Sequence, residues 1–413
     1  MKKLLVLAGK PIGTVEIINK AKQMGYYTIC TDYLPISQSA GKRIADEAWD
    51  LSTAEVETIA KLCKEQHIDG IATGVHEFNI NRMLDICDLT GLPCYCKRNT
   101  WLYCDDKLAF KHLCAANGIS VACEHSYEER GSLSYPVIVK PVDGSGSRGF
   151  HICNDVNELE AGYADALSFS PGGKVLIEDY IPYNAVIIHY TMDHGKCIYS
   201  GMSDKISVRF ASTGSSVMGI QMFPSKGEAI YLLKYNKIVC TMFEKAGFTD
   251  GPIWIEAFYD GKERFIFNEM GYRFGGSLTY HPVSYFHQID QLEALLLNAM
   301  HESSAPIIDS GPVGLEKYCI LPIHVKAGKI AQVQGEEIVK RRNDVYAYVP
   351  VHFEGDEIKD WGSAQQVFCY VHILFKSAAG LKASIKDILN ELKAETERGE
   401  NLLFTLFDVN SIE

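Results

Sequence analysis

The sequence predicts an α/β protein of more than one domain, and three observations carry that prediction. The chain has 413 residues, more than one ordinary hydrophobic core accommodates. Strand and helix patterns alternate through the first hundred residues, which is typical of a parallel, doubly wound sheet. Later, a glycine-rich loop at 144–149 joins two strand patterns instead of a strand and a helix.

The first region, residues 1–100, supplies the parallel sheet. We expect strands at 3–8, 26–32, 46–52 and 68–74, and helices at 14–25, 54–67 and 79–91. Ser52 or Thr53 is the expected cap of the second helix. The apolar run in 3–8 is too short for a signal peptide and is interpreted as a strand. The first turn offers only Gly9 and Gly13, so the dinucleotide fingerprint is missing where that ligand would need it.

The second region, 101–310, has more strand patterns than the first. We expect helices at 105–119 and 229–247, strands at 134–141, 149–154, 174–182 and 185–193, and a hairpin over 251–276 turning at Asp260-Gly261. Asp155 and Glu158 are typical of a capping box for a further helix. The segment 203–225 is polar and is predicted to be a loop.

The third region, 311–413, is expected to form a small α+β domain. It contains strand patterns at 316–325, 329–334, 366–375 and 402–407, and a helical pattern at 382–397.

Composition excludes several classes of partner. The net charge is −12 with no basic stripe, so nucleic acid is not an expected partner. No apolar run approaches the ~20 residues of a membrane span. The thirteen cysteines are odd in number and contain no C-x-x-C pair, and Cys94 with Cys96 is a poor start for a zinc site. We therefore expect reduced thiols and a cytoplasmic protein.

The loop containing Gly144, Gly146 and Gly149 fits G-x-G-x-x-G, but its context does not fit a dinucleotide fold. A dinucleotide loop leads from a strand into a helix, whereas this loop leads into a strand. No Gly-Lys-Ser/Thr follows, so it is not a Walker loop. A strand–loop–strand of this kind predicts a flap whose backbone amides cover phosphates. The alternative is a plain glycine-rich hairpin.

Glu256 and Glu269 lie at nearly equal distances from the turn of the 251–276 hairpin, each within apolar sequence. Two carboxylates facing each other repel unless a cation lies between them. Mg²⁺ held by carboxylates and substrate phosphates satisfies that need. The alternative is an ion pair of either glutamate with Arg264 or Arg273.

Three cations accompany the carboxylates. Arg273, just after the second glutamate, is placed to contact a phosphoryl group or an anionic substrate. Lys107 opens the helix at 105–119, and Lys140 ends an apolar strand; both could neutralise phosphates. Surface positions are the alternative for all three.

Together these segments resemble the ATP-grasp superfamily. The ordered set is "DDKLAFKHLCAANGI", "PVIVKPVDGSGSRG", "VLIEDYI", "WIEAFYD" and "NEMGYRFGG". The resemblance implies an ATP-grasp domain at 101–310, a Rossmann-like pre-ATP-grasp domain at 1–100, and a C-terminal domain at 311–413 similar to that of biotin carboxylase and the purine-pathway carboxylating enzymes.

The resemblance also implies roles for individual residues. Lys107 and Lys140 would contact the phosphates of ATP, with Lys140 also near the adenine. Glu178 would accept from the adenine amino group, with backbone contacts from Asp179 and Ile181. Glu256 and Glu269 would bind Mg²⁺, with Mn²⁺ as an alternative ion, and Arg273 would stabilise an acyl phosphate step. The mobile phosphate flap would consist of Gly144, Ser145, Gly146, Ser147 and Gly149.

Two positions depart from the family pattern. Asn184 is the residue nearest to a ribose-binding glutamate that the family usually has. The metal motif is commonly Glu-x-Asn-x-Arg, but here Gly271 stands at the asparagine position. The second metal ion is therefore in doubt.

The resemblance implies an ATP-dependent carboxylate–amine ligase acting on small molecules, with a homodimer as the assembly it suggests. Its rivals are a carboxylase that activates bicarbonate and a nucleotide-binding protein without catalysis. Lys205 and Arg209 would meet the γ-phosphate or a carboxylate. Tyr280 and His281 would face the same cleft, where His281 is either a general base or a packed structural histidine.

Overall fold

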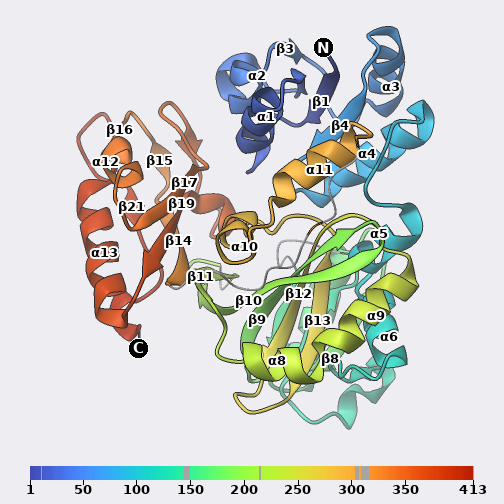
Figure 1. Ribbon diagram of the computed structural model, residues 1–413. Coiled ribbons are helices and arrows are strands. Elements are labelled where there is room, and N and C mark those ends of the chain that lie inside the picture. Colours follow the sequence, from blue (N-terminus) through green and yellow to red (C-terminus); the bar gives the residue numbers. More distant parts are fainter. Residues whose placement is uncertain (11, 144–148, 214, 303–306, 308–315, 413) are drawn as a thin grey trace.

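The computed structural model describes residues 1–10, 12–143, 149–213, 215–302, 307 and 316–412. The N-terminal domain lies at the top of Figure 1, the central domain below it, and the C-terminal domain to the left. The predicted α/β class is confirmed, because parallel and antiparallel sheets with packed helices make up the chain.

The N-terminal domain is built on a parallel sheet of order β3-β2-β1-β4. Its strands are β1 (Lys3–Leu7), β2 (Tyr27–Thr31), β3 (Glu47–Trp49) and β4 (Gly70–Thr73), and its helices are α1 (Thr14–Gln23), η1 (Ile36–Gln38), α2 (Ala40–Ile44), α3 (Val56–Glu65) and α4 (Glu77–Thr90). The predicted cap of α3 is wrong. The helix begins after Glu55, and the Thr53 hydroxyl instead donates to Oδ1 of Asn79 at 3.0 Å.

Helix α11 (Gln291–Ala299) packs against the N-terminal domain although it follows the central domain in sequence. Lys20 on α1 donates to Asp290 at 2.7 Å and to Glu293 at 2.6 Å. Two carboxylates at the start of α11 therefore bind one cation of the first domain, while Leu295 and Leu296 are buried beneath them.

The central domain begins with a small antiparallel sheet of order β5-β8-β6-β7. The elements of this part are α5 (Arg98–Asp105), α6 (Lys107–Ala116), β5 (Glu124–His125), η2 (Tyr127–Gly131), β6 (Val137–Pro141), β7 (His151–Cys153), α7 (Val156–Ser168) and β8 (Val175–Asp179). Asp155 caps α7 as predicted, because it accepts from the backbone N–H groups of Asn157 and Glu158. The reciprocal half of the predicted capping box is not formed, because Glu158 accepts from the N–H of Asn154 instead of that of Asp155.

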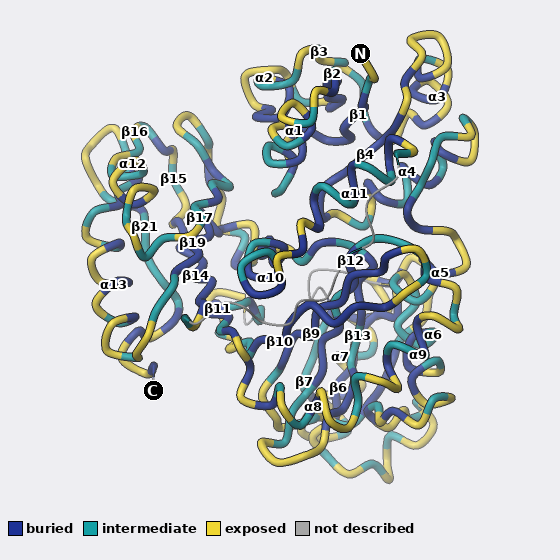
Figure 2. Tube along the Cα trace, in the orientation of Figure 1, coloured by how far each residue is buried: buried dark blue, intermediate teal, exposed yellow. Residues whose placement is uncertain are grey.

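A second, larger sheet has the order β13-β12-β9-β10-β11-β14-β19-β17, with β21 on β14. The central domain contributes β9 (Asn184–Asp193), β10 (Lys196–Arg209), β11 (Ser216–Phe223), β12 (Gly251–Tyr259) and β13 (Phe265–Gly271), with helices α8 (Glu228–Lys234), α9 (Asn236–Ala246) and α10 (Tyr280–His287). Figure 2 shows that β9 and β12 are buried along most of their length, whereas β10 is buried mainly in its first half.

Two expectations for this domain are wrong. The segment 203–225 is not a loop, because most of it lies in β10 and β11. Lys205, Ser207 and Arg209 share one strand face, and that face lines a cavity. Because these positions are polar, the sequence lacks the alternation of apolar residues by which a strand is predicted. The helix expected at 229–247 is interrupted at Tyr235, so that α8 and α9 are separate helices.

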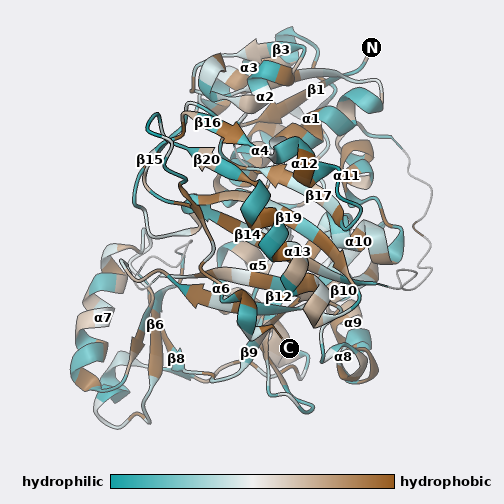
Figure 3. Cartoon of the chain, turned by 90° about the vertical axis from the view of Figure 1, so that its left-hand side faces the viewer, coloured by the Kyte–Doolittle hydropathy of each residue, from teal (hydrophilic) through white to brown (hydrophobic). Residues whose placement is uncertain are grey.

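The C-terminal domain continues the large sheet, since Gln221 of β11 pairs with Ile320 of β14. Its elements are β14 (Lys317–Val325), β15 (Gly328–Lys329), β16 (Gln332–Gln334), α12 (Glu336–Lys340), β17 (Val345–Pro350), β18 (Glu357–Ile358), η3 (Ala364–Gln366), β19 (Val367–Phe375), α13 (Ala378–Glu391), β20 (Lys393–Glu395), β21 (Leu403–Phe404) and η4 (Val409–Ser411). Figure 3 shows hydrophobic residues along β14 and β19, which form the core beneath α13.

The strand at 345–350 was not anticipated.

All thirteen cysteines are free thiols. Within the described ranges, no helix has the length and apolar character needed to cross a bilayer.

Candidate functional site

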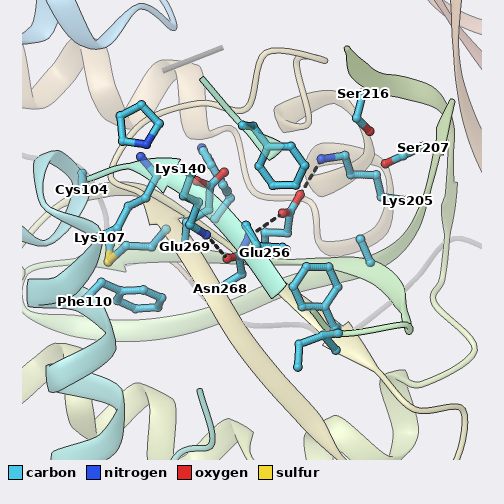
Figure 4. A pocket seen from close by; sticks show the side chains of 18 of the residues that line it. Cys104, Lys107, Phe110, Lys140, Lys205, Ser207, Ser216, Glu256, Asn268 and Glu269 are labelled. Carbon is cyan, nitrogen blue, oxygen red and sulfur yellow. Dashed lines mark hydrogen bonds and ion pairs between the residues drawn. The ribbon is translucent and has the colours of Figure 1, made fainter. Parts of the chain in front are cut away.

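A cavity of about 700 Å³ lies between the small sheet, the β12–β13 hairpin, β10 and the N-terminal helix α4. The predicted site residues that line it are Lys107, Lys140, Ile181, Asn184, Lys205, Arg209, Glu256, Glu269 and Arg273. Figure 4 shows several of these side chains converging from different elements. One chamber thus gathers cations, two carboxylates and apolar side chains.

The two glutamates face each other, as predicted from their distances to the turn. Glu256 pairs with Glu269 in the antiparallel register, and the next pair is Ala257 with Phe267, so Asn268 is the extra residue of a β-bulge. Neighbouring strand residues normally point to opposite faces. The bulge instead brings the side chains of both Asn268 and Glu269 to the cavity.

The bulge creates a chain of polar contacts. The Asn268 amide donates to Oε1 of Glu256 at 2.9 Å, and its carbonyl accepts from Nζ of Lys140 at 3.1 Å. Lys205 donates to Oε2 of Glu256 at 2.5 Å. Among the described residues, the Glu269 carboxylate has no hydrogen-bond or ion-pair partner. These oxygens are of the hard type that Mg²⁺ prefers.

Charge pairing controls ionisation at this site. Burial opposes the charged form of Glu256, but Lys205 and Asn268 outweigh it and hold the pKa of Glu256 below its usual value. Burial likewise opposes the charge on Lys205, and Glu256 reverses that effect so that the pKa of Lys205 is raised. Both groups are therefore charged at neutral pH.

A second cluster lies on β6, β8 and α6. The buried carboxylate of Glu178 forms ion pairs with both Lys111 and Lys140. Burial and the repulsion of Lys111 lower the pKa of Lys140 to about 7, and burial lowers the pKa of Lys111 to about 8. One carboxylate shared by two lysines leaves positive charge that an anionic ligand would stabilise.

The expected contact of Glu178 with adenine stays a prediction, and the position of its side chain does not favour it. Glu178 does not line the cavity, is only 2% exposed, and is occupied by the two lysines. The Asp179 side chain is also turned away and accepts from His125 at 2.7 Å. The neighbouring Tyr180 and Ile181 do line the cavity, so the segment after β8 reaches it without the carboxylates.

Arg273 is positioned by the N-terminal domain and by an aromatic ring. Its Nη2 donates to Oε1 of Glu77 at 2.8 Å, and its guanidinium carbon lies 5.1 Å from the centre of the Trp254 ring. Trp254 also explains the departure at Gly271, its partner in the strand register. A Cβ at position 271 would lie 2.4 Å from Nε1 of Trp254, so the asparagine of the family motif does not fit beside this tryptophan.

The flap region is described only at its edges. Lys107 donates to the carbonyl of Val142 at 3.3 Å. Gly149 is buried with φ +68° against Ala166 of α7, so this end of the predicted flap is anchored. Gly144, Ser145, Gly146 and Ser147 lie outside the described residues.

His281 is not among the residues lining the cavity, contrary to expectation. Helix α10 starts at Tyr280 and directs His281 toward Glu16 of α1, with 3.4 Å between Nε2 and Oε2. Its ring centre lies 4.9 Å from that of His372. The histidine thus sits where α10 meets the N- and C-terminal domains.

Several lining or supporting residues were not anticipated from sequence: Glu77, Lys111, Trp254 and Asn268. For Asn268 a signal was present, because two consecutive polar residues in an apolar strand indicate either a bulge or a buried polar group. The other three depend on contacts between distant segments and carry no local pattern.

Comparison with known structures identifies the architecture. A biotin carboxylase–β,γ-ATP complex from Campylobacter jejuni is similar at a TM-score of 0.77 and 18% identity, covering 98% of this chain and 92% of that one. An L-amino acid ligase from Bacillus licheniformis is similar at a TM-score of 0.74 and 18% identity, covering 95% and 98%. The chain therefore has the ATP-grasp fold, and the expected resemblance is confirmed at that level.

Sequence comparison agrees. Residues 107–223 match the family described as carbamoyl-phosphate synthase L chain, ATP binding domain. The carbamoyl phosphate synthase large chain of Clostridium acetobutylicum is 27% identical over 156 residues, which cover 37% of this chain. The match spans only 14% of that relative's length.

Proposed function

We propose that the protein is an ATP-dependent carboxylate–amine ligase. The observation that supports it best is the single cavity in which Glu256, Asn268 and Glu269 face the cations Lys140, Lys205 and Arg273. Opposed carboxylates beside converging cations suit a bound metal–nucleotide better than either ligand alone. The L-amino acid ligase of the same fold supports this reaction class.

In this proposal ATP occupies the cavity with its base against apolar lining residues, of which the cavity has Phe150, Ile152, Ile181 and Phe258. Glu256 and Glu269 would hold Mg²⁺, which when bound neutralises phosphate charge. Lys205 now donates to Glu256 and would turn to the phosphates when a metal takes its place.

The proposed reaction has two steps. An oxygen of the substrate carboxylate attacks the γ-phosphorus, so an acyl phosphate forms and ADP leaves. An amine nitrogen then attacks the acyl carbon, forming the C–N bond while phosphate departs and the nitrogen loses a proton. Lys140, Lys205 and Arg273 stabilise the charge that develops.

A carboxylase that activates bicarbonate is the second candidate, because the biotin carboxylase complex aligns over almost the whole chain. Fold alone does not select between the two substrates. A non-catalytic nucleotide-binding protein is the third, and the intact carboxylate and lysine constellation weighs against it. The homodimer stays a prediction, which sedimentation of the purified protein would check.

The decisive experiment measures ADP release from Mg²⁺-ATP while amino acids are supplied singly, in pairs, and with bicarbonate. Release that requires two organic substrates supports the ligase, and release with bicarbonate and one amine supports the carboxylase. Binding of ATP with no turnover by any combination favours the non-catalytic alternative. Absence of ATP binding contradicts all three.

A matched pair of variants tests the site. Glu269→Gln should lower ADP release by about 100-fold, which corresponds to ~2.7 kcal/mol of transition-state stabilisation. Glu263→Gln removes the same charge from an exposed ion pair with Lys234 at the end of the same hairpin and should leave the rate unchanged. Equal effects of the two changes would show that ADP release does not depend on the Glu269 carboxylate.

A further inference from the structure

The small sheet carries a group of metal-binding side chains outside the cavity. Cys123 precedes β5 and His125 ends it, so the two lie two residues apart along an extended segment. Such residues point to the same face. Asp179, the last residue of β8, lies beside them, and its backbone N–H donates to the carbonyl of Cys123 at 3.0 Å. Two hydrogen-bonded segments thus hold the three side chains.

The donor atoms are already close together. Sγ of Cys123, an imidazole nitrogen of His125 and a carboxylate oxygen of Asp179 lie within 4.8 Å of one another. Nε2 of His125 is 2.7 Å from Oδ1 of Asp179. Tetrahedral zinc bonds of ~2.0–2.3 Å place ligand atoms roughly 3.3–3.8 Å apart. An ion therefore needs the nitrogen and oxygen to separate by about half an ångström, and the sulfur, already within 4.8 Å of both, to approach by at most about 1 Å.

The donor set selects a class of metal. Thiolate and imidazole ligands favour Zn²⁺ and related transition metals over Mg²⁺. The Cys123 side chain is exposed and the other two are partly exposed, so a fourth position stays open to water. A second cluster of Asp193, His194 and Asp250 lacks a thiol, and both carboxylates accept backbone N–H groups.

We propose that Cys123, His125 and Asp179 form a three-ligand site for a Zn²⁺-class cation, distinct from the Glu256–Glu269 site. Binding releases the thiol proton of Cys123 to solvent, and the metal–sulfur bond takes its place. The ion replaces the hydrogen that His125 and Asp179 share. Because Tyr180 and Ile181 follow Asp179 directly and line the cavity, the ion ties β5 to a wall of the proposed nucleotide chamber.

The test titrates the reduced, full-length protein with Co²⁺ in excess Mg²⁺ and follows the thiolate-to-cobalt charge-transfer absorption, then measures Zn²⁺ binding by equilibrium dialysis. The wild type should show the band and bind one equivalent of Zn²⁺. Cys123→Ser should abolish the band, and His125→Ala should weaken Zn²⁺ binding by about tenfold or more.

Two controls make the result specific. His194→Ala disrupts the second cluster, and Cys94→Ser removes a thiol lying 3.8 Å from that of Cys96; both should keep the band and the affinity. Absence of Co²⁺ and Zn²⁺ binding by the wild type overturns the proposal. So does a band that survives in Cys123→Ser or disappears in Cys94→Ser. Circular dichroism of each variant verifies that it folds.

Discussion

At the scale of single residues, Gly271 and Trp254 form a matched pair. The absence of a side chain at position 271 makes room for the indole, and the indole supports Arg273. The departure from the Glu-x-Asn-x-Arg pattern is therefore a steric consequence of Trp254. Asn268, which bonds both Glu256 and Lys140, supplies an amide to the same site from a different position.

Gly271→Ala should displace the Trp254 ring and with it Arg273, because the new Cβ would lie 2.4 Å from the indole. We expect kcat for ADP release to fall by about tenfold, or ~1.4 kcal/mol. Overpacking should also lower the free energy of unfolding by ~1–3 kcal/mol. Gly276→Ala is the control, since nothing lies within 4 Å of a Cβ there. Unchanged kcat in Gly271→Ala would refute the steric argument.

Lys140 predicts proton uptake on nucleotide binding. Its pKa is lowered to about 7 by burial and by Lys111, so near pH 8 most of the population is neutral. Nearby phosphates favour the charged form and raise the pKa, and the protein therefore takes up close to one proton. At pH 6 the lysine is already charged and the uptake should vanish.

Calorimetric titration with ATP in buffers of different ionisation enthalpy measures this uptake. Lys140→Met should remove it, and Lys262→Met, at an exposed turn, should not. Proton release at pH 8 by the wild type would contradict the prediction.

At the scale of elements, the bulge in β13 decides which side chains reach the cavity. It brings Asn268 and Glu269 to one face opposite Glu256, which a regular strand does not do. The hairpin β12–β13 thereby presents three oxygen-bearing side chains to the cavity. β10 presents Lys205 beside them, and Arg209 of the same strand also lines the cavity.

Asn268→Ala should weaken the apparent affinity for Mg²⁺ by about tenfold, since groups that orient metal ligands commonly contribute that much. The KM for ATP at saturating Mg²⁺ should change less. The measurement is ADP release as a function of Mg²⁺ concentration. Asn157→Ala, on the exposed face of α7, provides the comparison, and identical Mg²⁺ curves for both variants would rule out the positioning role.

Element type was readable from local sequence for most of the chain and failed over 203–225, where β10 and β11 were expected to be a loop. Strands β1, β4, β6 and β14 are apolar and buried, so their patterns identify them. The end of β10 exchanges apolar for polar residues because it faces the cavity, and it therefore looked like a loop. The polar residues that suit this strand to the cavity are also the reason why its sequence lacks a strand pattern.

At the scale of the whole molecule, the site belongs to two domains. Glu77 on α4 of the N-terminal domain holds Arg273, which follows the last strand of the central domain. The position of Arg273 consequently depends on how these domains pack. Helix α11 strengthens that packing through Lys20, Asp290 and Glu293.

Glu77→Gln should lower kcat/KM for ADP release by about tenfold, because the neutral amide binds the guanidinium less strongly. Glu57→Gln, on the neighbouring helix α3, is the control. Partial recovery in Glu77→Asp would support a charge-dependent positioning role. Loss of stability without loss of rate in Glu77→Gln would instead indicate a purely structural ion pair.

The sequence by itself determined the order of the motifs, the strand–glycine loop–strand arrangement and the opposition of Glu256 and Glu269. These features are local, because a tight turn sets the register of its own hairpin. Only the tertiary structure decided that Glu178 forms ion pairs with Lys111 and Lys140, that Arg273 donates to Glu77, and that His281 lies outside the cavity. The first two contacts join residues 67 and 196 positions apart, and no periodicity of neighbouring residues encodes which distant charges meet when domains pack.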